Sequence, residues 1–428
     1  MKVFYFLYFL FLPFNVYAYL DPGTGSLLLY ALVGIVTSIL YLFKGLFYKI
    51  VTLFLGKTNI NKSQNKVYDI VIYTEGSRYY DVFKPLVDIF LNNKHPITII
   101  TQDKEDNFFS ITDSNLQVIY PGNEYATFNL LNNLHANILI STTPNLNVYM
   151  WKKSKNVKKY IHIFHSPTSI DFYEKYSLSY YDVVFSCVST TESAQQFLDT
   201  KRNLHKKEFY NVGCLYYDVL VQKIDKIKRN SNKRTILYAP SWGIRSSLPS
   251  FGNELISQLL SLGFSVIFRP HPQSFISDKS ILEFVLNKYK QNENFICDNS
   301  KSPLQSMVES DLLITDFSGI LFDYYFLINK PILLASDSIK KFGYEIEEIP
   351  YEYQFDIPYS EKFSTRIDKF NIKEQLDSIF TTQTTSSLDS KETSSRFLNH
   401  SDIISNFGCA AEKAYEIIMN ISKEIKNV

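Results

Sequence analysis

The stretch "LLITDFSGILFDYYFLINKPILL", residues 312–334, decides the fold class of this chain. The apolar residues at its start and end have the length and composition of buried strands, and the residues between have the spacing of a helix. A short polar segment, Thr315 to Gly319, separates the first strand from the helix. Strand, turn, helix and strand in this order form the repeating unit of a parallel α/β sheet covered on both faces.

The same unit recurs along the chain. Strands are predicted in the first part at 67–74, 96–101, 115–120, 136–141, 159–165 and 182–188, and in the second part at 235–240, 265–270, 294–298, 312–315 and 331–335. Helices are predicted at 78–93, 191–198 and 408–425, a linker at 221–234 and a Ser/Thr-rich loop at 376–402. The pattern predicts an α/β architecture, with two doubly wound Rossmann-like domains facing a cleft.

The domain boundaries follow from these strands and from the charged linker. An N-terminal Rossmann-like domain is predicted at 67–225 and a C-terminal Rossmann-like domain at 233–385. A C-terminal helix is predicted within 403–428.

The N-terminus is predicted to be a membrane anchor within residues 1–50, followed by a juxtamembrane linker at 51–66. Segments 3–20 and 27–43 are almost entirely apolar, and the second is just long enough to span a bilayer. Lys44 and Lys49 follow it, so the positive-inside rule places the remaining chain in the cytoplasm, at the plasma membrane. The first segment could instead be a signal peptide cleaved after Ala18, which leaves this orientation unchanged.

The composition excludes several classes of partner. The chain of 428 residues has 44 Lys and Arg against 43 Asp and Glu, so nucleic acid is not an expected partner. The four cysteines show no CxxC spacing, and no GxGxxG or GxxxxGK[ST] motif occurs. No acidic pair stands at a strand end of the second domain. We therefore expect no cofactor and no metal.

The polar segment 315–319 is a candidate phosphate site. It follows a strand and opens a helix, where free backbone N–H groups and the helix dipole favour an anion. Ser318 adds a hydroxyl, and Gly319 would allow a ligand to approach closely. The alternative is ordinary N-capping of the helix by Asp316 or Ser318.

A second candidate anion site follows the strand at 265–270. In "FRPHPQS", residues 268–274, Arg269 and His271 lie between stiffening prolines. A guanidinium suits a phosphate because it presents several N–H donors in a fixed plane. The alternative is a solvated turn.

Three other strand ends carry reactive side chains. In "IHIFHSPTSID", residues 161–171, His165 ends the strand and is the candidate proton acceptor, whereas His162 is interpreted as structural. In "LYAPSWG", residues 237–243, Ser241 and Trp242 end a strand, and the indole would pack either on a nucleobase or in the core. Glu75, Gly76 and Arg78 follow the first strand as candidate acceptor-binding residues, although Glu75 is equally explained as a helix-capping residue.

Three of these segments, in this order, resemble the CDP-glycerol glycerophosphotransferase family of teichoic-acid and capsule synthesis. The segments are "LYAPSW", "FRPHP" and "DLLITDFSGILFDYYFLINKPILL", and the last helix, "GCAAEKAYEII", also resembles the family's closing helix. The matching residues are Tyr238, Pro240, Ser241, Trp242, Arg269, His271, Pro272, Asp311, Thr315, Asp316, Phe317, Ser318, Phe322, Asp323, Tyr324, Lys330 and Pro331. The family's first-domain histidine corresponds to His165, with Ser166 in place of the usual glycine.

This resemblance implies a membrane-associated enzyme of GT-B fold without an active-site metal. It implies that the domain at 67–225 is the acceptor domain and the domain at 233–385 the CDP-donor domain. It implies transfer of a polyol phosphate, glycerol phosphate first of all, from a CDP-linked donor to a lipid-linked or glycan acceptor, with release of CMP. The implied catalytic residues are His165 and His271, and the implied donor-binding residues are Arg269, Ser241, Thr315, Asp316, Ser318, Gly319 and Asp323. The alternatives are a GT-B glycosyltransferase using a UDP- or CMP-sugar and a non-catalytic membrane assembly protein.

Overall fold

The computed structural model describes residues 66–230, 233–300, 302–335, 343–385 and 402–427. The predicted membrane segments 3–20 and 27–43 lie outside these residues. No helix within the described ranges combines the length and apolar character needed to cross a membrane. We call residues 66–230 the first half and 233–385 the second half.

The first half is built on a seven-stranded parallel sheet of order β3-β2-β1-β4-β5-β6-β7. Its strands are β1 Tyr68–Thr74, β2 Ile97–Thr101, β3 Leu116–Ile119, β4 Ala136–Ser141, β5 Val157–Ile163, β6 Val183–Ser186 and β7 Glu208–Asn211. Its helices are α3 Tyr80–Asn92, α4 Glu124–Asn132, α5 Thr190–Lys201 and α6 Leu215–Ile224, with short 3-10 turns η2 Ser77–Tyr79 and η3 Asn107–Ser110. The sequence missed β7, which lacks a buried apolar run.

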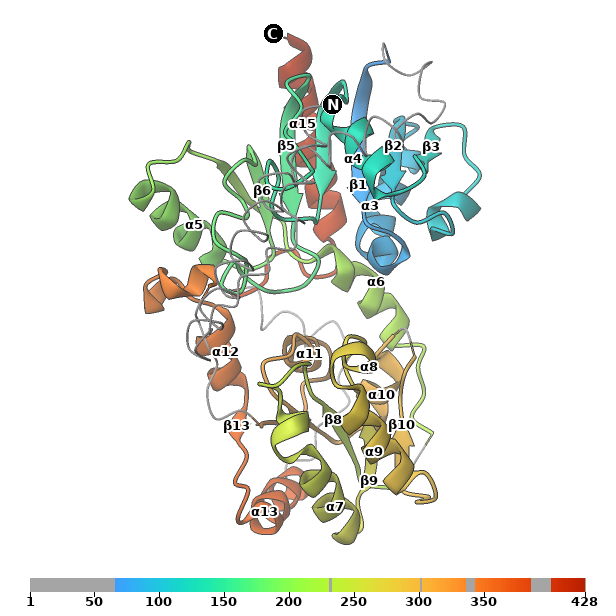
Figure 1. Cartoon of the computed structure of the whole chain (residues 1–428), viewed down its shortest axis with the longest axis vertical. Helices are drawn as coiled ribbons and strands as arrows, with labels where there is room; N and C mark the ends of the chain where they lie inside the picture. The colour runs from blue at the N-terminus through green and yellow to red at the C-terminus, as the bar shows by residue number, and fades with distance from the viewer. Residues whose placement is uncertain (1–65, 231–232, 301, 336–342, 386–401, 428) are drawn as a thin grey trace, which may run out of the picture. The chain divides into compact units, whose positions relative to one another are not determined.

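The second half contains a six-stranded parallel sheet of order β10-β9-β8-β11-β12-β13 (Figure 1). Its strands are β8 Thr235–Ala239, β9 Ser265–Phe268, β10 Phe295–Cys297, β11 Leu312–Thr315, β12 Ile332–Leu334 and β13 Thr365–Arg366. In both sheets the order reverses beside the first strand, between β1 and β4 and between β8 and β11. This is the Rossmann-like, GT-B-like arrangement that the sequence predicted.

The helices of the second half cover this sheet. They are α7 Asn253–Ser261, α8 Ser274–Ser277, α9 Lys279–Tyr289, α10 Leu304–Glu309, α11 Ile320–Asp323, α12 Asp356–Phe363 and α13 Ile372–Thr385, with π-helical turns η4 Leu248–Gly252 and η5 Tyr324–Ile328 and 3-10 turns η6 Glu345–Glu347 and η7 Tyr351–Tyr353.

Two predicted irregular segments are partly helical. The predicted linker 221–234 begins inside α6, which continues to Ile224 because Leu220 and Ile224 are buried. The predicted loop 376–402 begins inside α13, where Leu376 and Phe380 pack into the core of the second half. In both segments tertiary burial outweighs a polar local composition.

The last helix, α15 Ala410–Asn427, returns to the first half, where it packs beside α3 and α6 (Figure 1). Its apolar face, with Ala414, Ile418 and Ile421, joins the core on one side of the first sheet. Asp218 of α6 fixes its start, because the carboxyl accepts hydrogen bonds from the backbone N–H groups of Ala410 and Ala411 at 3.1 and 2.8 Å.

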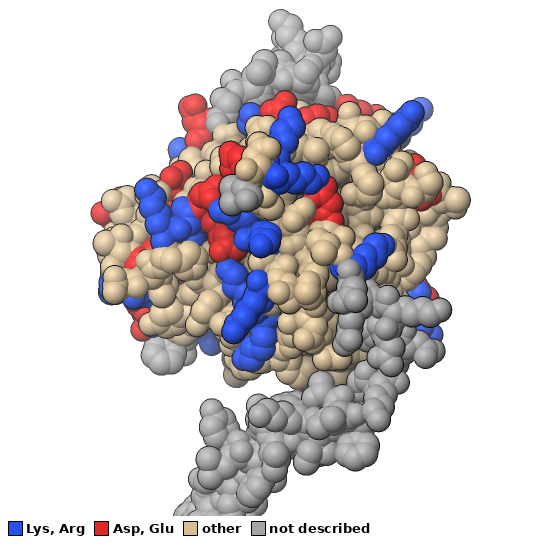
Figure 2. Space-filling view, turned by 90° about the horizontal axis from the view of Figure 1, so that it is seen from above, with Lys and Arg blue, Asp and Glu red and all other residues tan. Residues whose placement is uncertain are grey.

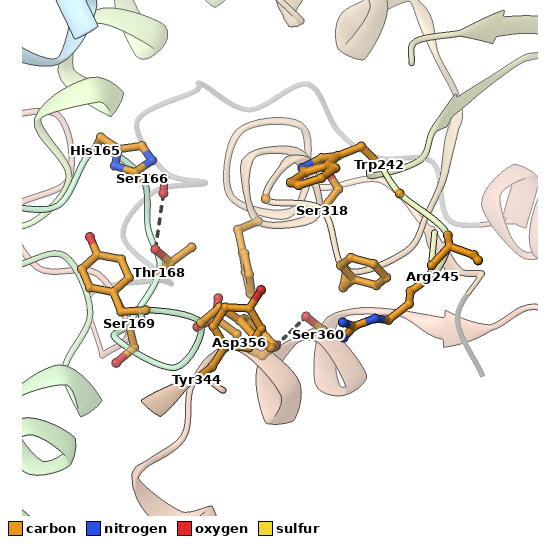
Figure 3. A pocket seen from close by; sticks show the side chains of 17 residues that line it. His165, Ser166, Thr168, Ser169, Trp242, Arg245, Ser318, Tyr344, Asp356 and Ser360 are labelled. Atoms are coloured by element: carbon orange, nitrogen blue, oxygen red, sulfur yellow. Dashed lines mark hydrogen bonds between the residues drawn. The ribbon is translucent and has the colours of Figure 1, made fainter. Parts of the chain in front are cut away.

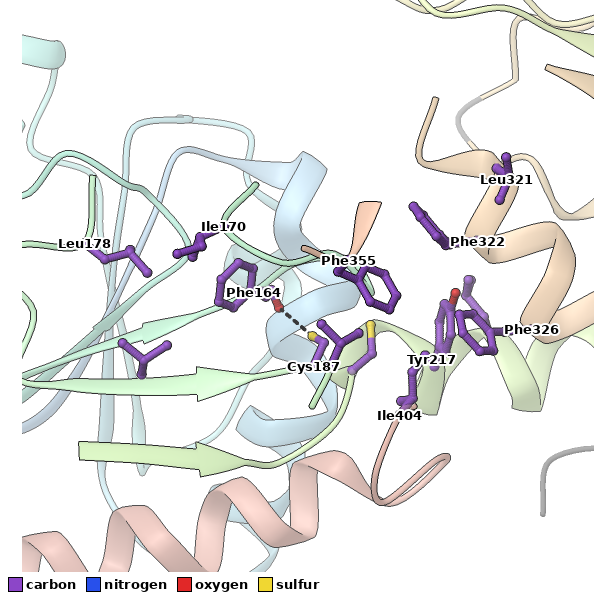
Figure 4. Packing of buried hydrophobic residues seen from close by; sticks show 14 of the residues in the cluster. Phe164, Ile170, Leu178, Cys187, Tyr217, Leu321, Phe322, Phe326, Phe355 and Ile404 are labelled. Carbon is purple, nitrogen blue, oxygen red and sulfur yellow. Dashed lines mark hydrogen bonds between the residues drawn. The ribbon is translucent and has the colours of Figure 1, made fainter. Parts of the chain in front are cut away.

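One apolar cluster connects the two halves. Phe164 and Cys187 of the first half belong to the same buried cluster as Leu321, Phe322 and Phe355 of the second (Figure 4). The charged surface is mixed, because basic and acidic side chains are interspersed on the face seen in Figure 2. This agrees with the near balance of 44 basic and 43 acidic residues.

Candidate active site

A cavity of about 740 Å³ is lined by residues of both halves (Figure 3). The first half contributes His165, Ser166, Thr168, Ser169, Phe172 and Tyr173, which follow β5. The second half contributes Trp242, Gly243, Ile244 and Arg245 after β8, Phe317, Ser318, Gly319 and Phe322 after β11, and Tyr344, Asp356 and Ser360 farther along the chain.

The cavity lies where the topology of the second sheet favours a ligand. Strands β8 and β11 are adjacent, with Thr315 opposite Ala239, and the strand order reverses between them. Ligands of doubly wound sheets bind outside the carboxyl ends of the strands at such a switch point. The loops that follow β8 and β11 both line the cavity.

Ser318 and Gly319 line the cavity as the sequence predicted. Gly319 precedes α11, and neither Asp316 nor Ser318 makes a side-chain capping hydrogen bond there. The capping alternative is therefore wrong. A Cβ added to Gly319 would meet no atom within 4 Å, so the backbone is open on that side. In Figure 3, Ser318 and Trp242 lie on the side of the cavity opposite His165.

Asp316 and Thr315 were predicted to bind the donor, but they do not line the cavity. Their side chains instead form hydrogen bonds with the end of β8 and the loop that follows it. Asp316 is fully buried, and its carboxylate accepts hydrogen bonds from the backbone N–H of Ser241 at 2.8 Å and from the N–H and Oγ of Ser247 at 2.8 and 3.0 Å. Thr315 is also buried, and its Oγ1 donates to the carbonyl of Ala239 at 2.6 Å. These bonds hold the loop after β8 against the end of β11.

That loop carries a cation that the sequence interpretation missed. Arg245 lines the cavity, and no ion pair or hydrogen bond of its side chain occurs within the described ranges. In Figure 3 its guanidinium points toward the side of the cavity where Asp356 and Ser360 lie. The sequence feature that could have identified Arg245 as a site residue is its position three residues after Trp242, in a loop that follows a strand.

Arg269, predicted to bind the donor, does not line the cavity. Its guanidinium donates to Asp298 at 2.6 Å, to the Oγ of Ser300 at 3.2 Å and to the carbonyl of Ser300 at 2.9 Å. The guanidinium therefore connects β9 to the loop after β10 and is already occupied.

His271 is not among the residues that line the cavity, but its ring centroid lies 6.3 Å from that of Trp242. Its Nδ1 accepts a hydrogen bond from the backbone N–H of Gln273 at 3.1 Å. Burial lowers the pKa of this imidazole, while Asp316 and Asp278 act in the opposite direction. The neutral ring therefore carries its proton on Nε2, where it is a hydrogen-bond donor.

His165 lines the opposite wall, two residues beyond the end of β5 rather than within the strand. Burial lowers its pKa to about 4, and the nearby Arg78 acts in the same direction. Its ring packs edge to face on Tyr79 at 5.5 Å, and Arg78 lies over that tyrosine ring at 4.8 Å. The imidazole is therefore neutral at pH 7, which is the form that accepts a proton.

His162 is structural, as the sequence indicated. It is fully buried on β5, and its Nε2 lies 3.1 Å from the hydroxyl of Tyr173. Burial and the neighbouring His165 lower its pKa to about 3.

The remaining predicted site residues lie outside the cavity lining. Glu75 forms an ion pair with Arg78, and Gly76 has a φ of 134°, where a Cβ would lie 2.8 Å from the Cβ of Asp103. Ser241 is buried, and its backbone N–H donates a hydrogen bond to the carboxylate of Asp316. Asp323 accepts a hydrogen bond from the hydroxyl of Tyr217 at 3.0 Å, and burial raises its pKa to about 7.

No group of three His, Cys, Asp or Glu side chains suited to a metal ion occurs in the part of the chain that the structure describes.

The sequence interpretation missed three residues that line the cavity, Tyr344, Asp356 and Ser360. They lie 25 or more residues after Gly319 and carry no local motif.

Sequence comparison assigns the family. The profile described as CDP-Glycerol:Poly(glycerophosphate) glycerophosphotransferase matches residues 75–419, which include the first part of α15 and every strand of both sheets except β1. The chain belongs to this glycerophosphotransferase family. It is an enzyme of that family, as the sequence predicted, and no curated protein matches it individually.

Solved structures support the fold of this glycerophosphotransferase. The wall teichoic acid polymerase TagF, in a form soaked with CDPG, aligns with a TM-score of 0.56 at 17% identity over 89% of this chain and 97% of TagF. A putative UDP-N-acetylglucosamine 2-epimerase from Listeria monocytogenes aligns with a TM-score of 0.52 at 14% identity, over 83% and 97% of the two chains. At these identities the likeness shows the shared two-sheet, GT-B-like fold.

Proposed function

We propose that this glycerophosphotransferase transfers a polyol phosphate, glycerol phosphate first of all, from a CDP-linked donor to a hydroxyl of a lipid-linked or glycan acceptor. The observation that carries the proposal is the composition of the single cavity described above. A neutral imidazole, His165, lies on one wall, and anion-binding groups of Ser318 and Arg245 lie on the other. Proton acceptance and phosphate binding are the two requirements of this reaction.

We place the CDP-linked donor against the residues of the second half. Ser318 and the backbone around Gly319 offer O–H and N–H donors to the pyrophosphate, and Arg245 offers a positive charge. His271, with its proton on Nε2, lies next to Trp242, with 6.3 Å between the ring centroids, and would reach the donor if the indole moved. Trp242, 49% exposed, offers a flat surface on which the cytosine can pack.

The reaction follows from this placement. The oxygen of an acceptor hydroxyl attacks the phosphorus of the polyol phosphate while His165 takes the hydroxyl proton. The bond from that phosphorus to the bridging oxygen breaks, and CMP leaves with the electron pair. Arg245 and the donors around Ser318 stabilise the negative charge that develops on the leaving phosphate.

The test uses the full-length chain in detergent, with a crude lipid acceptor and radiolabelled CDP-glycerol, CDP-ribitol, a UDP-sugar or a CMP-sugar. Label transferred from a CDP-polyol with stoichiometric release of CMP supports the proposal. The variant His165→Ala is expected to lower turnover on the order of a hundredfold, with CDP binding nearly unchanged. Transfer from a sugar nucleotide alone would indicate a glycosyltransferase, and no transfer from any donor would indicate a non-catalytic assembly protein.

The proposed location is the cytoplasmic face of the plasma membrane, which the two N-terminal apolar segments and Lys44 and Lys49 support. A CDP-linked donor is made in the cytoplasm, so the cavity must face that side. A reporter enzyme fused after residue 60 is expected to be active in the cytoplasm. Activity only on the outer side would contradict both the topology and the proposed reaction.

A further inference from the structure

Two buried aspartates, one from each half, lie in contact beside the cavity, through a hydrogen bond from the backbone N–H of Asp356 to the carboxylate of Asp171. Asp171 follows β5 in the first half and is fully buried. Asp356 opens α12 in the second half, is 7% exposed and lines the cavity (Figure 3). They are 185 residues apart in the sequence, and no sequence motif pointed to either of them.

The environment of Asp171 favours its ionised form. Its Oδ2 accepts hydrogen bonds from the backbone N–H groups of Phe355 and Asp356, at 2.7 and 2.9 Å. Hydrogen bonds of this kind stabilise a carboxylate relative to the neutral acid. Asp171 therefore holds the start of α12 against the first half.

The environment of Asp356 favours its neutral form. Burial and the neighbouring Asp171 raise the pKa of its carboxyl well above the usual range, although hydrogen bonding to the backbone of Ser169 acts in the opposite direction. Two adjacent buried carboxyls are most stable when they share a single negative charge. Because Asp171 receives the hydrogen bonds that stabilise the charge, the proton belongs to Asp356.

A purely structural contact between the halves explains Asp171 but not Asp356. The Oδ2 atom of Asp356 is buried and has no hydrogen-bond partner within the described residues. Leaving a buried polar group unpaired is unfavourable, so such groups normally have a partner. The cavity wall around Asp356 also contains Tyr344, Ser360 and Arg245, whose polar groups suit a polar ligand.

We infer that Asp356, as a neutral carboxylic acid, donates a hydrogen bond to a hydroxyl group of the polyol bound in the cavity. This inference rests on the proposed function and names the part of the substrate that this end of the cavity recognises. The hydroxyl would come from the polyol of the donor or from the terminal polyol of the acceptor. The positive charge of Arg245 on the same side suits the phosphate to which either polyol is attached.

The experiment compares three variants of the full-length chain by calorimetric titration in detergent. Asp356→Ala removes the hydrogen-bonding group, and Asp356→Asn keeps one acceptor and an N–H donor without a charge. Asp218→Asn is the matched control, because Asp218 is a buried carboxyl that likewise accepts two backbone N–H groups at the start of a helix but does not line the cavity. The ligands are CDP, CDP-glycerol and a soluble glycerol phosphate oligomer.

The inference predicts a specific pattern. Asp356→Ala should bind CDP like the wild type but bind either CDP-glycerol or the oligomer about ten- to a hundredfold more weakly. The ligand that is affected identifies the donor or the acceptor as the source of the hydroxyl. Asp356→Asn should bind close to the wild type, because the amide retains a donor, and Asp218→Asn should leave all three affinities unchanged.

Three results would overturn the inference. The first is unchanged binding of both polyol ligands by Asp356→Ala. The second is an equal loss of affinity in Asp356→Asn and Asp356→Ala, which would indicate that the carboxylate acts as an acceptor. The third is a wild type that binds neither polyol ligand. Failure of the proposed function is separate. A wild type that binds CDP-glycerol but transfers nothing disproves the reaction, while the variants still decide the role of Asp356.

Discussion

The carboxylate of Asp316 accepts two hydrogen bonds from Ser247, one from its backbone N–H at 2.8 Å and one from its Oγ at 3.0 Å. A third bond, from the backbone N–H of Ser241, joins the other end of the same loop to Asp316. The loop between these serines carries Trp242 and Arg245 into the cavity. The aspartate in the middle of "LLITDFSGILF" therefore positions the cavity wall without contacting the space inside it.

Asp316→Ala is expected to lower the free energy of unfolding by about 3 kcal/mol or more, because it leaves buried N–H groups of Ser241 and Ser247 without an acceptor. CDP binding should weaken as a consequence of the displaced loop. Chemical denaturation followed by fluorescence measures the first effect and calorimetry the second. Asp316→Asn, which retains one acceptor oxygen, should lose less stability. Normal unfolding of Asp316→Ala with lost CDP binding would instead support direct contact with the donor.

Ser318→Ala is expected to weaken CDP binding about ten- to a hundredfold, since a hydrogen bond to a charged group contributes roughly 1.5–3 kcal/mol. Its melting temperature should stay unchanged, because the Ser318 side chain makes no capping bond to α11. Calorimetric titration of CDP and a melting curve on the same preparation measure both quantities. Wild-type CDP affinity combined with a lower melting temperature would mean that Ser318 has only a structural role.

Arg245 and Arg269 form a matched pair for testing which cation holds the donor. Arg245→Ala should weaken CDP binding at least tenfold through loss of a charge-assisted bond and leave unfolding unchanged. Arg269→Ala should reduce stability by about 2 kcal/mol, because it removes the partner of Asp298, and leave CDP binding unchanged. The opposite result, with binding lost only in Arg269→Ala, would show that the ion pair with Asp298 opens when the donor binds.

The buried His162 makes stability depend on pH. Its pKa in the folded chain is about 3, below the value of about 6.5 expected in the unfolded chain. The unfolded state therefore binds more protons below pH about 6.5, and the contribution of His162 to stability, complete above that pH, falls as the pH decreases toward 3. At pH about 4.5 the loss is on the order of 2 to 3 kcal/mol.

The measurement compares urea unfolding of the wild type and His162→Gln at pH 7.5 and 4.5, conditions chosen to lie on either side of about 6.5. The glutamine can keep the hydrogen bond to Tyr173 but does not titrate, so its unfolding free energy should fall less on acidification. Asp218 and Asp323, with pKa values of about 7, favour the folded state at lower pH in both proteins and cancel in the comparison. Equal acid sensitivity of both proteins would exclude His162 as a cause.

The fold class, and the edge of the second sheet whose loops line the cavity, could be predicted from the sequence alone. Apolar runs such as 67–74 and 312–315 predicted their strands because a strand buried on both faces needs a continuous apolar stretch. The positions of His165 and Ser318 on loops after strands then followed, since carboxyl ends of parallel strands share one edge. Strands β7 and β13 were missed because they are short and their residues are partly or fully exposed.

The contacts of each polar side chain could be read only from the three-dimensional fold. Arg269 has the residue type of an anion site, yet its guanidinium is paired with Asp298. Asp316 was predicted to bind the donor, yet its carboxylate accepts hydrogen bonds from a loop about 70 residues away in the sequence. Asp171 and Asp356 meet although 185 residues separate them. The position of a strand depends on the local pattern of apolar residues. The partner of a charged group depends instead on which distant segments the fold brings together. Whether the group is free to bind a ligand is therefore known only once those segments are placed.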